Sequence, residues 1–358
     1  MNETFLKHKF LIYPLLLASF IFCFDKLFGT DFVRKYTESR IEYAFYAEKG
    51  ALLAQLLEFQ SKKKPNEKLL VLFGTSHFGE FSHKYIQEKD KRLTTYNFSA
   101  PMAPPSYLYY NLHILLKAGV KIDYAVLEII PEIFQDAANE YALKFSYDWK
   151  FMFENRDIFS GSELESYTHA NLFNVIRFPP RLNIAMQRIK DKSKIDAFEY
   201  FNSMVHLATK QNNGGIPNPI IHEVPEEFFE KESNVYFGQA FRKQGNQTFV
   251  ESNVQRKFFE KFIETCKQNN IKLLVYKPIV SKSLQKLLDE SDFYANWWKE
   301  KSEFAQKNHI PMLNMVDYTN SIQCQKFVDV HHLSGGCYPE ITDILLEKIL
   351  PQINDEHR

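Results

Sequence analysis

The stretch LLVLFGTSHFGEF, residues 69–81, constrains the fold more than any other part of the sequence. Its first five residues, Leu69–Phe73, are apolar without interruption. Such runs are typical of strands that are buried on both faces of a parallel sheet. A charged linker with a proline, residues 61–68, precedes the run, and Gly74 begins a turn directly after it. The sequence therefore predicts a buried strand with Ser76 at its carboxyl end.

Four further segments are predicted to be strands, and helical segments separate most of them. The strand candidates are residues 93–99, 123–130, 271–280 and 311–317. The helices between them include residues 107–119, 253–270 and 293–308. Strands joined by helices of this length imply βαβ units and a mainly parallel sheet. We therefore predict an α/β fold with three layers, α/β/α.

The chain divides into three parts in this prediction. Residues 1–30 form a signal-anchor or transmembrane helix, and residues 31–68 form a juxtamembrane helix and a linker. Residues 69–358 form the α/β domain. Within that domain the strand–helix alternation is lost at about 132–250, so we expect a mostly helical insertion there.

The N-terminal segment FLIYPLLLASFIFCF, residues 10–24, carries no charge and follows Lys7 and Lys9. It is shorter than the roughly 20 apolar residues that a spanning helix needs. No small-residue cleavage site follows it, which argues against a cleaved signal peptide. A core helix is the alternative. We expect a single-pass anchor in the inner (cytoplasmic) membrane, with the main domain in the periplasm or extracytoplasmic space.

Charge and motif content argue against two classes of partner. Lys+Arg and Asp+Glu both number 44, so the chain has no basic excess and we expect no nucleic-acid partner. The sequence contains neither a GxGxxG nor a Walker pattern, and we expect no cofactor.

The four cysteines predict no metal site, because they form no CxxC pair and no Cys/His spacing that suits zinc. Cys324 and Cys337 lie close in the sequence. They could form a disulfide in an oxidising compartment or remain two separate buried thiols, and the sequence leaves both states open.

A serine, a histidine and an aspartate are placed where acyl-transfer chemistry needs them. A nucleophilic serine needs a base within hydrogen-bond reach, and the base needs an orienting carboxylate. Ser76 follows the first predicted strand, while Asp329 and His332 lie in the loop before the C-terminal helix. Parallel sheets bind their ligands beyond the carboxyl ends of the strands. We therefore predict Ser76 as the nucleophile, His332 as the base and Asp329 as its orienting acid.

Three neighbouring residues leave alternatives open. His331 could be the base instead of His332, through an Asp-x-His spacing from Asp329. His77 could contact an acceptor or be a surface residue of the turn. Lys277 ends a predicted strand and could line the same crevice edge, or belong to the cap of the following helix.

These motifs resemble those of the SGNH (GDSL-like) hydrolase superfamily, over about residues 69–350 without the insertion. The similarity is to its membrane-anchored branch, which includes the D-alanyl-lipoteichoic-acid protein of Gram-positive bacteria and alginate O-acetylation proteins. The sequence is also similar to a leptospiral family of anchored proteins without an assigned function. The resemblance implies that Ser76 of FGTSH is the nucleophile, and that Asp329 and His332 of DVHHLS complete a triad. It also implies an SGNH or flavodoxin-like sheet and an oxyanion-hole N–H near Ser99, in NFSAPMAPPS.

The sequence departs from the superfamily pattern at two places. The usual Gly-Asp-Ser is here Gly74-Thr75-Ser76, and the third block reads LEIIPE instead of Gly-x-Asn-Asp. The asparagine that donates to the oxyanion in the hydrolases is therefore absent, and Glu128 and Pro131 occupy that region. Glu128 is either a buried carboxylate of the oxyanion- or substrate-binding region or a polar residue at the strand end. Loss of one oxyanion donor lowers a rate by about 10²–10³.

Three hypotheses follow. The first is a membrane-anchored extracytoplasmic serine esterase or O-acyltransferase that acts on an envelope glycan or lipid through an acyl-enzyme. A membrane acyltransferase is an optional partner in that reaction. The second is a catalytically weak binding or assembly module of the cell envelope with the same fold. The third is an unrelated doubly wound protein.

Overall fold

A computed structural model describes residues 3–38, 43–241 and 249–355 of the 358-residue chain. It contains two compact units. The helical unit comprises Met1–Ala44 and Leu143–Met204, and the sheet unit comprises Phe45–Ala142 and Val205–Arg358.

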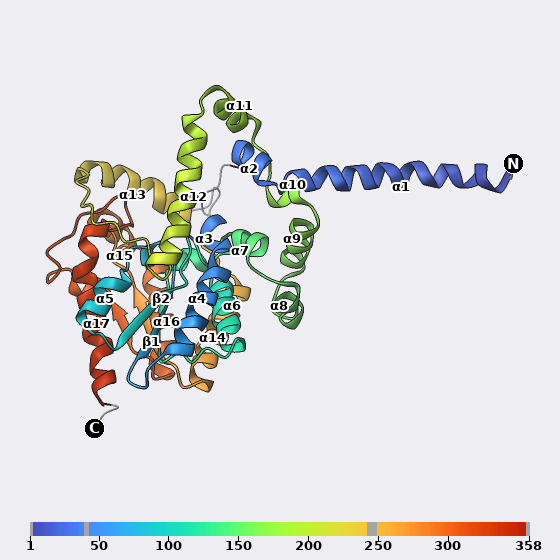
Figure 1. Cartoon of the computed structure of the whole chain (residues 1–358). Coiled ribbons are helices and arrows are strands. Elements are labelled where there is room, and N and C mark those ends of the chain that lie inside the picture. The colour runs from blue at the N-terminus through green and yellow to red at the C-terminus, as the bar shows by residue number, and fades with distance from the viewer. Residues whose placement is uncertain (1–2, 39–42, 242–248, 356–358) are drawn as a thin grey trace. The chain divides into compact units, whose positions relative to one another are not determined.

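A five-stranded sheet lies within the sheet unit (Figure 1). All neighbouring strands are parallel, and their order is β2-β1-β3-β4-β5. Each strand overlaps a segment that the sequence predicts as a strand, so the prediction of an α/β fold with a parallel sheet is confirmed. The strands are β1 Lys68–Phe73, β2 Leu93–Asn97, β3 Tyr124–Glu128, β4 Lys272–Lys277 and β5 Met312–Asn314.

The sheet has its switch point between β1 and β3. β2 lies on the outer side of β1, whereas β4 and β5 lie beyond β3. Parallel α/β folds bind ligands at the carboxyl edge of such a switch point. Phe73 pairs with Leu127 in the register of the two strands. The residues that follow β1 therefore lie beside Glu128, the last residue of β3.

Helices cover both faces of this sheet (Figure 1). α6 (Pro105–Lys117) and α14 (Asn253–Gln268) pack together on one face. α5 (His83–Lys89) and α17 (Tyr338–Asp355) lie on the other face. The arrangement is consistent with the predicted three layers, α/β/α.

The helix α14 shows how the sequence builds these layers. Its side chains Phe258 and Phe262 are one turn apart and buried, and the Phe262 ring centroid lies 5.1 Å from that of Phe73 in β1. Apolar residues at this spacing form one face of a helix. The Ser252 hydroxyl accepts a hydrogen bond from the backbone N–H of Gln255 and so caps the start of the helix.

The sheet unit contains further helices around this framework. α13 packs against α15 and lies in the sheet unit, although it belongs to the segment 132–250 that is predicted as an insertion. The α-helices are α4 Lys49–Lys62, α13 Glu226–Phe241, α15 Lys282–Asp289 and α16 Asp292–Lys307. Single 3₁₀ turns are formed by Ser76–Phe78, Pro131–Phe134, Asp136–Asn139, Met315–Tyr318 and Gly335–Cys337.

The helical unit combines the N-terminal segment with residues 143–204 of the predicted insertion. The Asp25 carboxylate accepts hydrogen bonds from the backbone N–H groups of Asn174 at 2.7 Å and Val175 at 2.8 Å, which attaches the end of α1 to α10. Its helices are α1 Glu3–Leu27, α2 Asp31–Thr37, α8 Trp149–Glu154, α9 Gly161–Leu172, α10 Asn174–Arg177 and α11 Leu182–Lys190. The chain passes between the units within α3 Tyr43–Ala47, α7 Glu140–Phe145 and α12 Ser193–Gln211.

The helix α1 carries the apolar segment that is predicted to be a membrane anchor. Its side chains at residues 12–24 are exposed, among them Leu15, Leu16 and Phe20. Within the described ranges, no single helix has both the length and the apolar character to cross a membrane. The pair Ile12–Leu27 and Asp31–Thr37, which is bent by 68°, meets the length and composition requirements together.

A disulfide joins Cys324 and Cys337, whose Cα atoms are 5.2 Å apart. It closes the loop that leads from β5 towards α17, and of the two states that the sequence leaves open the structure contains the bridged one. An antiparallel bridge between Phe327 and Leu333 folds this loop into a short hairpin. The Cys324–Cys337 loop carries both the aspartate and the histidine of the predicted triad.

Removing this disulfide is expected to destabilise the sheet unit. In the chain-entropy account, a bridge that closes a loop of about 15 residues contributes about 3 kcal/mol. The double variant Cys324→Ser/Cys337→Ser should therefore lower the free energy of unfolding of the sheet unit by about 3 kcal/mol. Urea unfolding is followed by tryptophan fluorescence in a Trp149→Phe background, because the remaining Trp297 and Trp298 both lie in the sheet unit.

Reduction of the parent protein with dithiothreitol should reproduce this loss and leave the double variant unaffected. Cys23→Ser, which removes an exposed free thiol, is the control and should unfold like the parent. Equal stability of the double variant and the parent would contradict a stabilising role for the disulfide.

Candidate active site

Ser76 is the first residue of the single 3₁₀ turn, Ser76–Phe78, that follows β1. It therefore lies at the carboxyl edge of the sheet, at the switch point between β1 and β3. The turn depends on glycine at position 74. A Cβ on Gly74 would lie 2.5 Å from Glu128 Oε2 and 2.7 Å from Phe78 Cδ2, so a side chain has no room there.

Glu128, at the end of β3, is fully buried and accepts hydrogen bonds from both neighbours of Ser76. Its Oε2 accepts from the Thr75 N–H at 2.6 Å, and the Thr75 hydroxyl donates to the carboxylate at 3.0 Å. His77 Nδ1 lies 2.6 Å from Oε1. A buried carboxylate needs such partners to compensate for lost hydration. Glu128 thereby fixes the backbone on either side of Ser76.

His77 is held from a second direction by α17. Burial alone would lower the pKa of His77, but the Glu128 carboxylate outweighs burial and the pKa is raised. The His77 carbonyl accepts a hydrogen bond from the Tyr338 hydroxyl at 2.5 Å. Burial raises the pKa of Tyr338 well above its usual value, so this hydroxyl remains a donor. The turn is therefore attached both to β3 and to α17.

The structure brings Ser76, His332 and Asp329 together in one chain of hydrogen bonds. Ser76 Oγ lies 2.7 Å from His332 Nε2, and His332 Nδ1 lies 2.8 Å from Asp329 Oδ2. The other carboxylate oxygen of Asp329 accepts the backbone N–H groups of His332 at 2.8 Å and His331 at 3.0 Å. A hydroxyl, an imidazole and a carboxylate in this order can carry out acyl transfer.

Electrostatics favour an ionised Asp329. Burial alone would raise its pKa, but the hydrogen bond and charge interaction with His332 outweigh burial and hold the pKa well below its usual value. The carboxylate is therefore charged at neutral pH. It orients the imidazole so that Nδ1 carries the proton and the lone pair of Nε2 faces Ser76.

His331 lies beside this chain of hydrogen bonds. Its Nε2 is 3.7 Å from Asp329 Oδ1, which is too long for a hydrogen bond. Its ring packs against the ring of Tyr236 in α13, with centroids 4.7 Å apart. Burial and the neighbouring His332 lower the pKa of His331 to about 3. Of the two histidines considered as the base, His332 is the one that the geometry favours.

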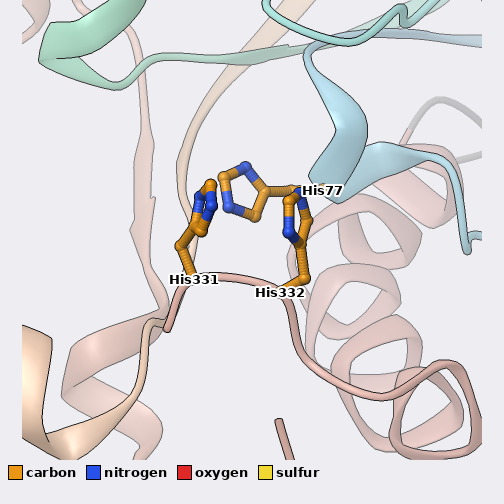
Figure 2. A group of neighbouring side chains, drawn as sticks. All are labelled: His77, His331 and His332. Atoms are coloured by element: carbon orange, nitrogen blue, oxygen red, sulfur yellow. The ribbon is translucent and has the colours of Figure 1, made fainter. Parts of the chain in front are cut away.

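Figure 2 shows the rings of His77, His331 and His332 turned toward one another. The His332 centroid lies 5.0 Å from that of His77 and 4.2 Å from that of His331. One nitrogen of each ring lies within 4.8 Å of the other two. The cysteine spacing predicts no metal site, but these three imidazoles form a donor set that could hold a metal ion.

Ser99 lies near the site but its N–H is engaged. The backbone N–H of Ser99 donates to Asn97 Oδ1 at 3.0 Å, and the following N–H, of Ala100, donates to the Gly74 carbonyl at 3.1 Å. Asn97 in turn donates its Nδ2 to the Phe78 carbonyl at 2.6 Å. The segment around Ser99 therefore supports the turn after β1 through hydrogen bonds.

The Lys277 ammonium packs against two aromatic rings. Its ammonium lies 4.6 Å from the ring centroid of Trp298 and 5.0 Å from that of Tyr294, both in α16. Burial lowers its pKa to about 8. The contacts of Lys277 are therefore cation–π contacts with α16, and among the described residues it makes no hydrogen bond to Ser76, His332 or Asp329.

Tyr236 and Glu132 are two residues beside the histidines that no sequence pattern predicts. The Tyr236 hydroxyl donates to Glu132 Oε1 at 2.7 Å, and burial raises the pKa of Glu132. Among the described residues, Glu132 Oε2 is buried without a hydrogen-bond partner. Tyr236 lies about 100 residues from Glu132, and the strand–helix alternation is lost in the sequence between them, so no spacing pattern connects the two. The one available signal was the acidic residue that follows Pro131, a few residues after the end of β3.

The sequence matches one family, described as "Protein of unknown function (DUF1574)", over residues 5–349. The match spans nearly the whole chain, both units included. No curated protein matches the sequence.

Gly74→Ala is expected to disturb the site without removing a polar group. The added Cβ would overlap Glu128 Oε2 and the Phe78 ring, so the turn or the strand must shift. Overpacking of this kind costs about 1–3 kcal/mol of stability, which urea unfolding in the Trp149→Phe background measures. Gly50→Ala in α4 is the matched control, because a Cβ there meets no atom within 4 Å. The control should be neutral or stabilising, and equal effects at both glycines would contradict the packing described for the turn.

Proposed function

The chain belongs to the DUF1574 family of proteins of unknown function, and we propose that it is a serine esterase or O-acyltransferase that forms an acyl-enzyme on Ser76. The observation that carries the proposal is the hydrogen-bonded chain from Ser76 through His332 to Asp329, with distances of 2.7 and 2.8 Å. These groups, in this order, are what serine acyl transfer requires. The position of Ser76 at the switch point of a parallel sheet supports the proposal.

In the first half-reaction, the Ser76 oxygen attacks the carbonyl carbon of a substrate ester while His332 Nε2 takes the hydroxyl proton. Asp329 stabilises the imidazolium that results. When the tetrahedral intermediate collapses, the bond to the leaving oxygen breaks and His332 returns the proton to that oxygen. The products are a free alcohol and an ester of Ser76.

In the second half-reaction, the attacking oxygen comes from water or from an acceptor hydroxyl. His332 takes a proton from it, the new ester or acid forms, and the Ser76 oxygen leaves and regains the proton. Attack by water completes an ester hydrolysis. Attack by an acceptor hydroxyl completes an acyl transfer, so the same residues serve both reactions.

The developing oxyanion needs N–H donors. We assign the Ser76 N–H to this role, because Glu128 holds the residues on both sides of it. The Ser99 N–H is the second candidate, and it would become available if the Asn97 side chain turned away from it. A site with one donor is slower than a site with two by about 10²–10³.

The strand order supports an SGNH or flavodoxin-like form of the fold. The order 2-1-3-4-5 is that of the flavodoxin-like doubly wound sheets. The sequence similarity to the SGNH superfamily rests on the segments that here supply Ser76, Asp329 and His332. We propose SGNH membership on these two grounds together.

We propose that the site lies outside the cytoplasm and that α1 anchors the chain in the inner membrane. The Cys324–Cys337 disulfide supports this location, because disulfides persist in oxidising compartments. The exposed apolar side chains of α1 support contact with lipid. The substrate class that fits such a location is an envelope glycan or lipid, and a membrane acyltransferase is a partner that could supply the acyl group.

A second candidate function is a catalytically weak binding or assembly module of the envelope. The observation that favours it is the engaged N–H of Ser99, which leaves the oxyanion with fewer free donors. In this case the fold and the triad geometry serve to bind an acylated glycan or lipid rather than to turn it over.

A fluorophosphonate probe is expected to label the full-length chain, purified in mild detergent, at Ser76. Ser76→Ala should abolish labelling, because it removes the oxygen that attacks the probe. Ser61→Ala, at an exposed position in α4, is the matched control and should label like the parent. Labelling is read from in-gel fluorescence and the labelled peptide is identified by mass spectrometry. A folded parent protein that stays unlabelled would favour the binding module over the enzyme.

Asp329→Asn should slow labelling by a factor on the order of 10⁴, because the imidazole loses the carboxylate that sets its tautomer. The asparagine can still accept the backbone N–H groups of His331 and His332, so the loop should keep its fold. The measurement is the second-order rate constant of labelling, with a thermal melt to show that the variant is folded. A labelling rate equal to that of the parent would remove Asp329 from the mechanism.

A further inference from the structure

The three imidazoles of His77, His331 and His332 form the strongest feature of the sheet unit that acyl transfer leaves unexplained (Figure 2). Acyl transfer uses only one of them. We propose that these three side chains bind a divalent transition metal of the zinc type, and that metal binding and the Ser76–His332 hydrogen bond exclude each other.

The donor set suits such an ion. Imidazole nitrogen is a preferred ligand of zinc, and three protein ligands with one open position are common in zinc sites that exchange their fourth ligand. Zn–N bonds of about 2.0–2.1 Å in a tetrahedron place the nitrogens roughly 3.4 Å apart. One nitrogen of each ring already lies within 4.8 Å of the others. Side-chain movements of about 1 Å would close the site around an ion.

Carboxylates hold two of the three rings in the orientation that a metal ligand needs. His77 Nδ1 lies 2.6 Å from Glu128 Oε1, and His332 Nδ1 lies 2.8 Å from Asp329 Oδ2. Metal-ligating histidines typically donate their second ring nitrogen to a carboxylate in this way. In both residues Nδ1 is therefore engaged, and Nε2 is the nitrogen left to face another partner.

His77 Nε2 gives an independent reason to expect a ligand. His77 is only 5% exposed, and in the part of the chain that the structure describes its Nε2 is buried without a hydrogen-bond partner. An unpaired buried nitrogen is costly and uncommon in folded proteins. A metal ion bound to His77 Nε2 would satisfy this nitrogen.

His331 completes the site. It comes from the same loop as His332, and the Tyr236 ring packs against it with centroids 4.7 Å apart. His331 has no assigned role in acyl transfer. A role as the third ligand therefore explains why two consecutive histidines occur in this loop.

His332 Nε2 links the metal site to the serine. Its single lone pair either accepts the Ser76 hydroxyl, as at the distance of 2.7 Å, or binds the metal. A bound ion therefore removes the base from Ser76. This consequence rests on the proposed serine chemistry, whereas metal binding itself does not.

Metal binding is tested with Co²⁺ alone, which replaces zinc in tetrahedral sites and gives a visible absorption band there. Titration of the full-length, tag-free chain should produce this band at one Co²⁺ per chain, and Zn²⁺ should displace it. His331→Gln and His77→Gln should each lose the band while their thermal melts show a folded protein. His309→Asn is the matched control and should keep it, because His309 is exposed at the opposite edge of the sheet, and its φ of 57° suits asparagine.

The consequence for Ser76 is tested by probe labelling with and without Zn²⁺. Labelling of the parent should fall in proportion to occupancy of the Co²⁺-binding site, and EDTA should restore it. His331→Gln should label at one rate whether or not Zn²⁺ is present. Labelling that Zn²⁺ leaves unchanged in the parent, despite a Co²⁺ band, would overturn the mutual exclusion.

The two proposals fail in different ways. Absence of a Co²⁺ band in the parent, or a band that persists in both folded histidine variants, would overturn the metal site. Absence of labelling in metal-free parent protein would overturn the serine chemistry, and the Co²⁺ titration would then decide the metal site by itself.

Discussion

The buried carboxylate of Glu128 is the interaction on which the rest of the site depends. Burying a carboxylate costs several kcal/mol unless hydrogen bonds replace its water, so its partners are strongly constrained. Here the partners are Thr75 and His77, the two neighbours of Ser76. Because the buried Glu128 side chain needs these hydrogen bonds, it holds Ser76 in place between Thr75 and His77. Tyr338 adds a second attachment through the His77 carbonyl, so the turn is held at two points.

A second carboxylate, that of Asp329, fixes the loop that carries His332. Asp329 accepts two backbone N–H groups and one imidazole nitrogen, so one carboxylate fixes both the course of the loop and the orientation of His332. The Cys324–Cys337 disulfide closes the same loop covalently. In the proposed acyl transfer, groups that are held in place in advance would need no reorganisation when charge develops. Two rigid segments about 250 residues apart in sequence thus meet at the switch point between β1 and β3.

The sequence predicted the sheet because its strands are buried on both faces and therefore read as continuous apolar runs. It also predicted that Ser76 follows a strand and that Asp329 and His332 lie in the loop before the last helix, since strand ends and loops can be placed from the same pattern. The function of Glu128 could not be predicted, because a glutamate at a strand end looks the same whether it is buried or exposed. Its role follows from the register, in which Phe73 pairs with Leu127 and Glu128 comes to lie beside the turn. The histidine cluster was missed for a related reason: His77 meets the other two only in the folded chain.

The two chemistries proposed for this site share one physical requirement. A general base and a zinc ligand are both neutral imidazoles whose Nδ1 proton is held by a carboxylate and whose Nε2 lone pair is free. Glu128 and Asp329 hold the Nδ1 atoms of His77 and His332. In both residues Nε2 is thus the nitrogen that faces another partner, and in His332 that partner is the Ser76 hydroxyl. Under these proposals, the Ser76 hydroxyl and a metal ion compete for the single lone pair of His332 Nε2. Ser76 can react only while its own hydroxyl holds that nitrogen.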